Sequence, residues 1–187
     1  MLNKFRKIFD PFFNKVVSIV AKTDLPPLFW SSFGLAMAFL SCLSYSRIFF
    51  NQIYGGIFLL ISGFADVLDG AVARAKGLVS LKGAFLDSTF DRLGESLVYA
   101  GILIGGFCDS LFVLMALSFS LLVSYVRARG ESLGINLSGI GIGERAERIL
   151  ILSITSILGY VNYGVIIVLA LAFITFLQRI IIIIEKL

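Results

Sequence analysis

Long apolar stretches separated by short polar breaks dominate the chain. A helix that spans a bilayer needs about 20 mostly apolar residues, and the pattern predicts such spans at 28–47, 52–75, 83–107, 110–129, 145–161 and 163–184. Before them, lysine and arginine alternate with phenylalanine and valine in residues 1–22. This pattern predicts an amphipathic helix that lies on the membrane surface. We therefore expect an all-α integral membrane protein. One domain would fill residues 1–187, with an interfacial helix at 1–22 and a six-helix bundle at 28–184.

Composition narrows the class further. The chain has 187 residues, of which 58% are hydrophobic and 15% are charged, and its mean hydropathy is +0.98. These values lie outside the range of soluble globular domains. The net charge of +4 is scattered along apolar segments, so we expect no nucleic-acid partner. The chain has no histidine, which excludes histidine nucleophile activation and histidine metal sites.

The basic residues near the predicted spans indicate an orientation. If the N-terminus is inside, the inner loops 76–82 and 127–144 hold most of the lysines and arginines close to the spans. Arg47 is the cation closest to the outer loops. Cytoplasmic loops carry such an excess, so we expect a multi-pass cell-membrane protein whose two termini both lie in the cytoplasm.

Four aspartates interrupt this apolar pattern. Asp66 and Asp69 lie near the inner end of the second predicted span, and Asp87 and Asp91 near the inner end of the third. The spacings of three and four residues put each pair on one helix face. Because the connection at 76–82 is short, we expect the two spans to be antiparallel neighbours. Buried carboxylates are costly, and their oxygens suit hard cations such as Mg²⁺ or Mn²⁺.

Other residues of the same hairpin support a ligand site. Small residues allow helices to approach closely, and Gly70 leaves room for a phosphate. Arg74, four residues later, can reach a phosphate oxygen with a permanently charged planar group. Arg92 and Glu95 continue the face beyond Asp91. For these two, an ion pair within the membrane or a supporting role is as open as a direct role at the site.

The run D-x2-D-G-x2-A-R-x8-G-x3-D-x3-D from Asp66 to Asp91 resembles the signature of the CDP-alcohol phosphatidyltransferases, with every fixed position filled. The six-span plan is also similar to that family. The resemblance implies two divalent metal ions, one held by Asp66, Asp69 and Asp87 and the other by Asp66, Asp87 and Asp91. It implies that Asp91 is the catalytic base, that a homodimer forms, and that the active site is cytoplasmic.

The same resemblance implies the contacts of a CDP-linked donor. They come from Asp66, Gly70, Arg74 and Ser80. Many relatives also carry an Asn and a Thr before the first span. Here Leu28 and Ser31 stand at those positions, so the nucleotide contacts of that segment are not expected to carry over unchanged.

Arginines in the second half of the chain bear on the acceptor. The pattern around Arg127, Arg148 and Arg179 resembles the inositol-phosphate branch of the family, which implies that these three hold the acceptor's phosphate. Arg179 lies within an apolar span and needs an anionic partner, which a phosphorylated acceptor would supply. Arg129 and Arg145 are equally compatible with marking the inner membrane boundary.

We therefore expect transfer of a phosphatidyl-type group from a CDP-activated lipid to inositol phosphate, with release of CMP. The lipid is open between CDP-diacylglycerol and CDP-archaeol. Within the family, glycerol-3-phosphate or another alcohol as acceptor and CDP-inositol as donor are alternatives. A divalent-cation transporter is the alternative from another class, but it has no use for Arg74 beside the metals.

Overall fold

The computed structural model describes residues 20, 23, 25–48 and 51–187. The predicted surface helix at 1–22 lies outside these residues, apart from Val20. The described part is helical, with six long helices in the order α2 (Pro27–Tyr45), α3 (Gln52–Ala75), α4 (Leu81–Ile104), α5 (Ser110–Ser132), α6 (Arg145–Ile157) and α7 (Val161–Lys186). The all-α prediction is confirmed for the described residues.

Four of these helices, α2, α3, α5 and α7, are long and apolar enough to cross a membrane. Helix α4 is long enough to span, with 24 residues, but its first half carries several charged side chains, including Asp87 and Asp91, so it is not among these four. Helix α6 has only 13 residues, fewer than the prediction of 145–161, because the chain turns at Gly159 with φ +88°. The structure therefore supports a multi-pass membrane protein with four spans defined by length and composition.

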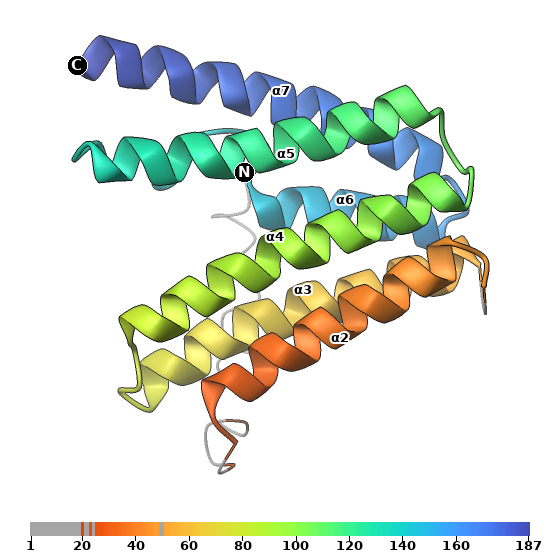
Figure 1. Ribbon diagram of the computed structural model, residues 1–187, viewed down its shortest axis with the longest axis horizontal. Coiled ribbons are helices and arrows are strands. Elements are labelled where there is room, and N and C mark those ends of the chain that lie inside the picture. The colour runs from red at the N-terminus through yellow and green to blue at the C-terminus, as the bar shows by residue number, and fades with distance from the viewer. Residues whose placement is uncertain (1–19, 21–22, 24, 49–50) are drawn as a thin grey trace.

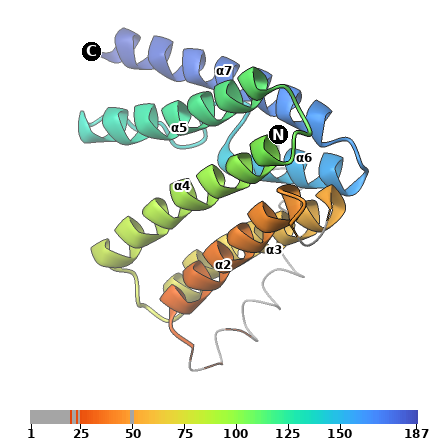
Figure 2. The same ribbon diagram turned by 45° about the vertical axis from the view of Figure 1, so that its right-hand side comes forward.

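Two groups of helices make up the bundle, as Figure 1 and Figure 2 show. Helix α2 packs extensively on α3 and α4, helix α5 packs on α7, and α6 joins the groups through contacts with α3 and α7. Helices α3 and α4 form the predicted antiparallel hairpin, but they pack mainly on α2 and hardly on each other. The two helices are therefore antiparallel, as expected, and most of their close packing is on α2 rather than on each other.

Glycines set the close approach of these helices. A Cβ added to Gly101 of α4 would lie 2.5 Å from the carbonyl oxygen of Cys42 in α2. One added to Gly56 of α3 would lie 2.7 Å from the carbonyl oxygen of Ser153 in α6. Small residues at such crossings let backbones meet where lipid provides no hydrophobic drive for helix association.

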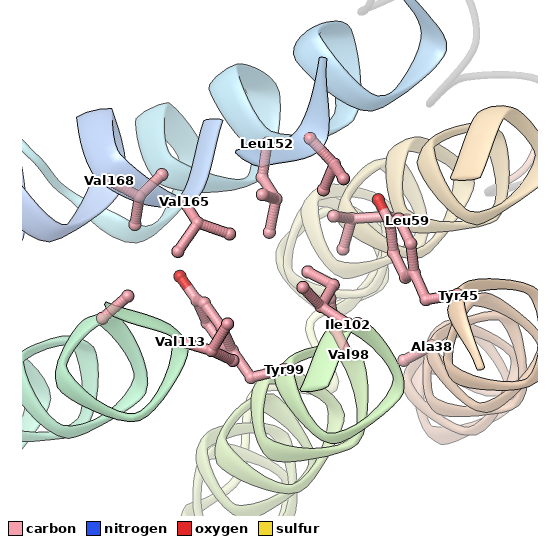
Figure 3. Packing of buried hydrophobic residues seen from close by; sticks show 12 residues of the cluster. Ala38, Tyr45, Leu59, Val98, Tyr99, Ile102, Val113, Leu152, Val165 and Val168 are labelled. Carbon is pink, nitrogen blue, oxygen red and sulfur yellow. The ribbon is translucent and has the colours of Figure 1, made fainter. Parts of the chain in front are cut away.

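The buried core lies where α4 meets the other helices (Figure 3). Val98, Tyr99 and Ile102 of α4 are almost fully buried and belong to one cluster with residues of the five other helices. The Tyr45 hydroxyl donates a hydrogen bond of 2.6 Å to Ser156 Oγ, tying α2 to α6. This core holds the two helix groups in register around the acidic motif.

Candidate metal centre and active site

The acidic motif occupies the parts of α3 and α4 that lead into and out of the turn of their hairpin, and Figure 1 shows this hairpin. Asp66 and Asp69 belong to the second half of α3, whereas Asp87 and Asp91 belong to the first half of α4. At the end of α3, the Lys76 ammonium donates to the carbonyl oxygens of Thr23 and Leu25. This lysine fastens the segment before α2 to the same end of the molecule.

Three of the four carboxylates converge. Asp66, Asp69 and Asp87 each offer an oxygen, and these oxygens all lie within 4.8 Å of one another. Asp69 is 5% exposed, and its Oδ2 accepts a 2.6 Å hydrogen bond from Ser31 Oγ of α2. A compact set of carboxylate oxygens with one ligand oriented by a neighbouring hydroxyl fits a hard divalent cation.

The fourth carboxylate has a different environment. Asp91 Oδ1 lies 2.9 Å from Arg145 Nη1, and the same nitrogen donates to Asp66 Oδ2 at 2.6 Å. Arg92 Nη1 is 3.7 Å from Asp91 Oδ2 and donates to the carbonyl oxygen of Ser88 at 2.6 Å. Asp91 is therefore joined to the metal-binding trio through an arginine of α6.

The residues expected at the nucleotide lie close to this centre in the sequence and on the same hairpin. A Cβ at Gly70 would lie 3.3 Å from Arg74 Nη1, so glycine allows the guanidinium to lie against the helix backbone. Ser80 is the N-cap of α4, and its Oγ accepts a 3.0 Å hydrogen bond from the Gly83 amide. Its hydroxyl proton remains available for a ligand.

Two of the arginines expected at the acceptor phosphate are 2% exposed and bonded within the protein. Arg148 pairs with Glu95 Oε1 at 3.1 Å and donates to the Gly143 carbonyl oxygen at 2.8 Å. Glu95, whose role the sequence left open, is thus ion-paired with Arg148. Arg179 donates to the carbonyl oxygens of Ile140 and Val123 at 2.9 and 2.8 Å.

These bonds organise the loop between α5 and α6. Arg179 Nη2 lies 3.8 Å from Glu144 Oε1, and Thr175 Oγ1 accepts a 2.9 Å hydrogen bond from the Gly143 amide. Arg127 is exposed and pairs with Glu131 at 2.9 Å. Arg127 and Arg148 both lie close enough to Arg179 to act on its charge. The three arginines thus lie near one another, each beside a glutamate, and only Arg127 of the three is exposed.

A hollow lies directly at the carboxylates. It is lined by all four aspartates together with Ser31 and Arg145. A second hollow adjoins it between α2, α3, α4 and α6 and is lined by Glu95 and Arg148. Arg145 lines both hollows, so its side chain separates the acidic centre from the buried ion pair.

Comparison with known proteins shows the family to which the chain belongs. The CDP-alcohol phosphatidyltransferase family profile matches residues 27–184, and the chain belongs to that family. It is 40% identical to the archaetidylinositol phosphate synthase of Methanothermobacter thermautotrophicus over 100% of this chain and 96% of the relative. It is also 40% identical to the enzyme of the same name from Pyrococcus horikoshii, over 96% of this chain and 95% of the relative.

Solved structures share the fold. The crystal structure of Mycobacterium tuberculosis phosphatidylinositol phosphate synthase with CDP-DAG bound matches with a TM-score of 0.77 and 24% identity, over 91% of this chain and 92% of that chain. The structure of the same enzyme with manganese and citrate matches with a TM-score of 0.78, over 91% and 88% of the two chains. The predicted family and the membrane-enzyme fold are confirmed.

Sequence reasoning did not predict two of the contacts at the centre. Arg145 approaches Asp66 from 79 positions away, a separation that no helical spacing relates. Ser31 reaches Asp69 across 38 positions. Its position in the segment before the first span gave a signal, because relatives carry a hydroxyl residue there.

Proposed function

We propose that this chain transfers the phosphate-linked lipid of a CDP-activated lipid to inositol phosphate and releases CMP. The observation that carries the proposal is the convergence of Asp66, Asp69 and Asp87 within 4.8 Å, with Asp91 beside them. The names of the full-length relatives support the acceptor, since two of them at 40% identity are archaetidylinositol phosphate synthases. Other relatives are named phosphatidylinositol phosphate synthases.

In this proposal the carboxylates hold two divalent ions, Mg²⁺ or Mn²⁺. Asp66, Asp69 and Asp87 would hold one ion, and Asp66, Asp87 and Asp91 the other. Such ions neutralise a pyrophosphate and stabilise CMP as the leaving group. Asp91 accepts the proton of the acceptor hydroxyl. The hydroxyl oxygen then bonds to the β-phosphorus, and the bond from that phosphorus to the oxygen of CMP breaks.

The nucleotide is held by the hairpin in this scheme. Gly70 allows close approach to α3, Arg74 supplies a charged donor, and Ser80 supplies a hydroxyl at the start of α4. Because the Ser80 oxygen already accepts from the Gly83 amide, its role toward the nucleotide is that of a donor. Asp66 would contact the donor as well as the ions.

For the acceptor phosphate we propose an unequal division among the three arginines. Arg127 is exposed and can rotate away from Glu131, since an exposed pair of this kind is worth only about 0.5 kcal/mol. Arg148 and Arg179 contribute positive charge at short range while their hydrogen bonds hold the loop at 140–144 in place. This division differs from the expectation that all three ligate the phosphate alike.

The membrane arrangement is part of the proposal. Helices α4 and α6 would lie within the bilayer alongside the four apolar helices, which gives six membrane-embedded helices. The lysines and arginines of the inner loops support a cytoplasmic location for both termini and for the acidic centre. Membrane lipids would surround the bundle, and the protein would act as a homodimer.

A panel of substrates tests the proposal. Purified protein is given CDP-archaeol or CDP-diacylglycerol, with Mn²⁺ or Mg²⁺, and inositol phosphate, glycerol-3-phosphate or unphosphorylated inositol, and CMP release is measured. We expect release with inositol phosphate. Release with glycerol-3-phosphate alone would reject the acceptor, and no release with any CDP-linked donor, CDP-inositol included, would reject the transferase and favour the cation-transport alternative.

A variant tests the base. Asp91→Asn should reduce turnover by about 10²–10⁴-fold, while the trio of Asp66, Asp69 and Asp87 continues to bind Mn²⁺. Loss of donor binding, with turnover of the bound donor unchanged, would count against Asp91 as the base.

A further inference from the structure

Arg145 contacts the acidic centre with one nitrogen. Its Nη1 lies 2.6 Å from Asp66 Oδ2 on α3 and 2.9 Å from Asp91 Oδ1 on α4. Its Nε is buried and has no hydrogen-bond partner among the described residues. A permanent arginine–carboxylate pair usually engages two nitrogens of the planar fork with one carboxylate. Here a single nitrogen bridges two carboxylates, much as a point cation does.

The bridged carboxylates are not a random pair. Asp66 and Asp91 are the residues that the proposed function assigns jointly to the second metal ion. The other position, formed by Asp66, Asp69 and Asp87, needs no rearrangement to bring its oxygens within 4.8 Å. Arg145 therefore contacts two of the three ligands proposed for the second position, Asp66 and Asp91, and only one ligand of the first, Asp66.

An arginine beside the four aspartates offsets part of their negative charge. Four carboxylates close together inside a membrane bundle repel one another and resist burial. Arg92 offers only a distant 3.7 Å contact to Asp91, and Arg148 is engaged with Glu95. Arg145 is the described cation with short contacts to the centre, and it stabilises Asp66 and Asp91 before any divalent ion is present.

We propose that Arg145 is an exchangeable internal cation. It balances Asp66 and Asp91 in the metal-free protein and gives up both carboxylates when the second divalent ion binds. This inference rests on the proposed two-metal function. It makes the two metal positions unequal, because the second ion must displace both contacts of Arg145 and the first ion at most the contact to Asp66.

The position of Arg145 in the chain gives the exchange a mechanical consequence. It is the first residue of α6 and follows Glu144, the N-cap. Its contacts to Asp66 and Asp91 are therefore also contacts of the α5–α6 loop with α3 and α4. When Arg145 leaves the carboxylates, the start of α6 loses these two contacts with the hairpin, while Arg148 one turn later stays paired with Glu95. Metal binding and the position of the loop before α6 are therefore linked.

Metal titration of the full chain tests the exchange. Wild type and Arg145→Gln, stripped with EDTA and reconstituted in lipid nanodiscs, are titrated with Mn²⁺, and free Mn²⁺ is followed by electron paramagnetic resonance. We expect two unequal sites in wild type and a weaker site that binds about tenfold more tightly in Arg145→Gln, a coupling of ordinary size. The control Arg129→Gln removes an exposed arginine and should leave both sites unchanged.

The unfolding temperature provides a second test of the exchange. Without metal, Arg145→Gln should unfold at a lower temperature than wild type, and saturating Mn²⁺ should remove most of the difference. A permanent structural role predicts the reverse for the metal, because the aspartates would lose their organiser and bind Mn²⁺ less tightly. A folded Arg145→Gln with an unchanged or weaker second site overturns the inference.

Three further outcomes bear on the exchange at Arg145. If Arg145→Gln does not fold, Arg145→Lys retains the charge and the wild-type titration still decides, since two sites of equal strength in wild type would overturn the exchange. If wild type binds Mn²⁺ at both sites but releases no CMP from any donor, the proposed function fails and the exchange stands. If wild type binds at most one ion, the two-metal proposal and the exchange fall together.

Discussion

The buried pair of Glu95 and Arg148 gives the sharpest test of how this bundle is held together. The side chains are 10% and 2% exposed, and the nitrogen and oxygen are 3.1 Å apart. Arg148→Met removes this contact and the 2.8 Å hydrogen bond to the Gly143 carbonyl oxygen. Breaking a buried pair from one side costs about 3–5 kcal/mol. Arg145 also acts on Glu95 electrostatically, which places the expected loss near 3 kcal/mol.

Replacement of both partners separates charge from packing. In the double variant Glu95→Leu/Arg148→Met no charge is left unpaired, so we expect about 2 kcal/mol of the loss to be recovered, as coupled neighbours allow. The measurement is the free energy of unfolding in mixed detergent micelles for wild type, Glu95→Leu, Arg148→Met and the double variant. Additive losses, or a single-variant loss below about 0.5 kcal/mol, would refute the account of the pair.

The same variants also test whether Arg148 helps to bind the acceptor phosphate. If Arg148 supplies charge to the acceptor phosphate as proposed, the double variant should require more inositol phosphate for half-maximal CMP release, although its stability has recovered. The requirement for the CDP-lipid should change little. A double variant with normal kinetics would restrict Arg148 to a role in folding.

Three further predictions concern other parts of the structure. Gly101→Ala places a Cβ 2.5 Å from the Cys42 carbonyl oxygen and should cost about 1–3 kcal/mol by overpacking; an unfolding midpoint equal to wild type would contradict the close α2–α4 crossing. Ser80→Ala removes the N-cap of α4 and should cost about 1 kcal/mol, measured by the same unfolding assay; a fully retained stability would show that the cap hydrogen bond contributes nothing. EDTA should abolish CMP release and added Mn²⁺ should restore it, so turnover that persists after chelation would rule out the metal centre.

Much of this architecture could be predicted from local patterns in the sequence. Apolar length predicted all six helices of the described part, and the spacing of the aspartates predicted their pairing on α3 and α4. These features depend on neighbouring residues along one helix, where the period of 3.6 residues determines which side chains share a face. The family signature added the chemistry, because its fixed positions occur within one hairpin.

Contacts between distant helices could not be predicted in the same way. The placement of α2 between α3 and α4 depends on the fit of glycines such as Gly101 against a backbone more than 50 positions earlier. The internal bonds of Arg179 depend on carbonyl oxygens of Val123 and Ile140, and backbone acceptors leave no mark on a sequence. An arginine in an apolar span signals a partner without revealing whether that partner is a ligand or the protein itself.

The division of the bundle into two helix groups has a consequence for how such enzymes diversify. All four carboxylates come from a stretch of 26 residues, 66–91, whereas the arginines proposed for the acceptor come from 127–179. Of the helices that carry these arginines, α5 and α7 pack on each other, and α6 packs on both α3 and α7. Selection can therefore alter α5 and α7, which would set the alcohol, with the chemistry of the first stretch left intact, provided that Arg145 at the start of α6 keeps its contacts to Asp66 and Asp91. A chimaera could join residues up to the short turn 105–109 of this chain to the second half of a relative that uses another alcohol. Such a protein would test in one step whether the second half sets the acceptor.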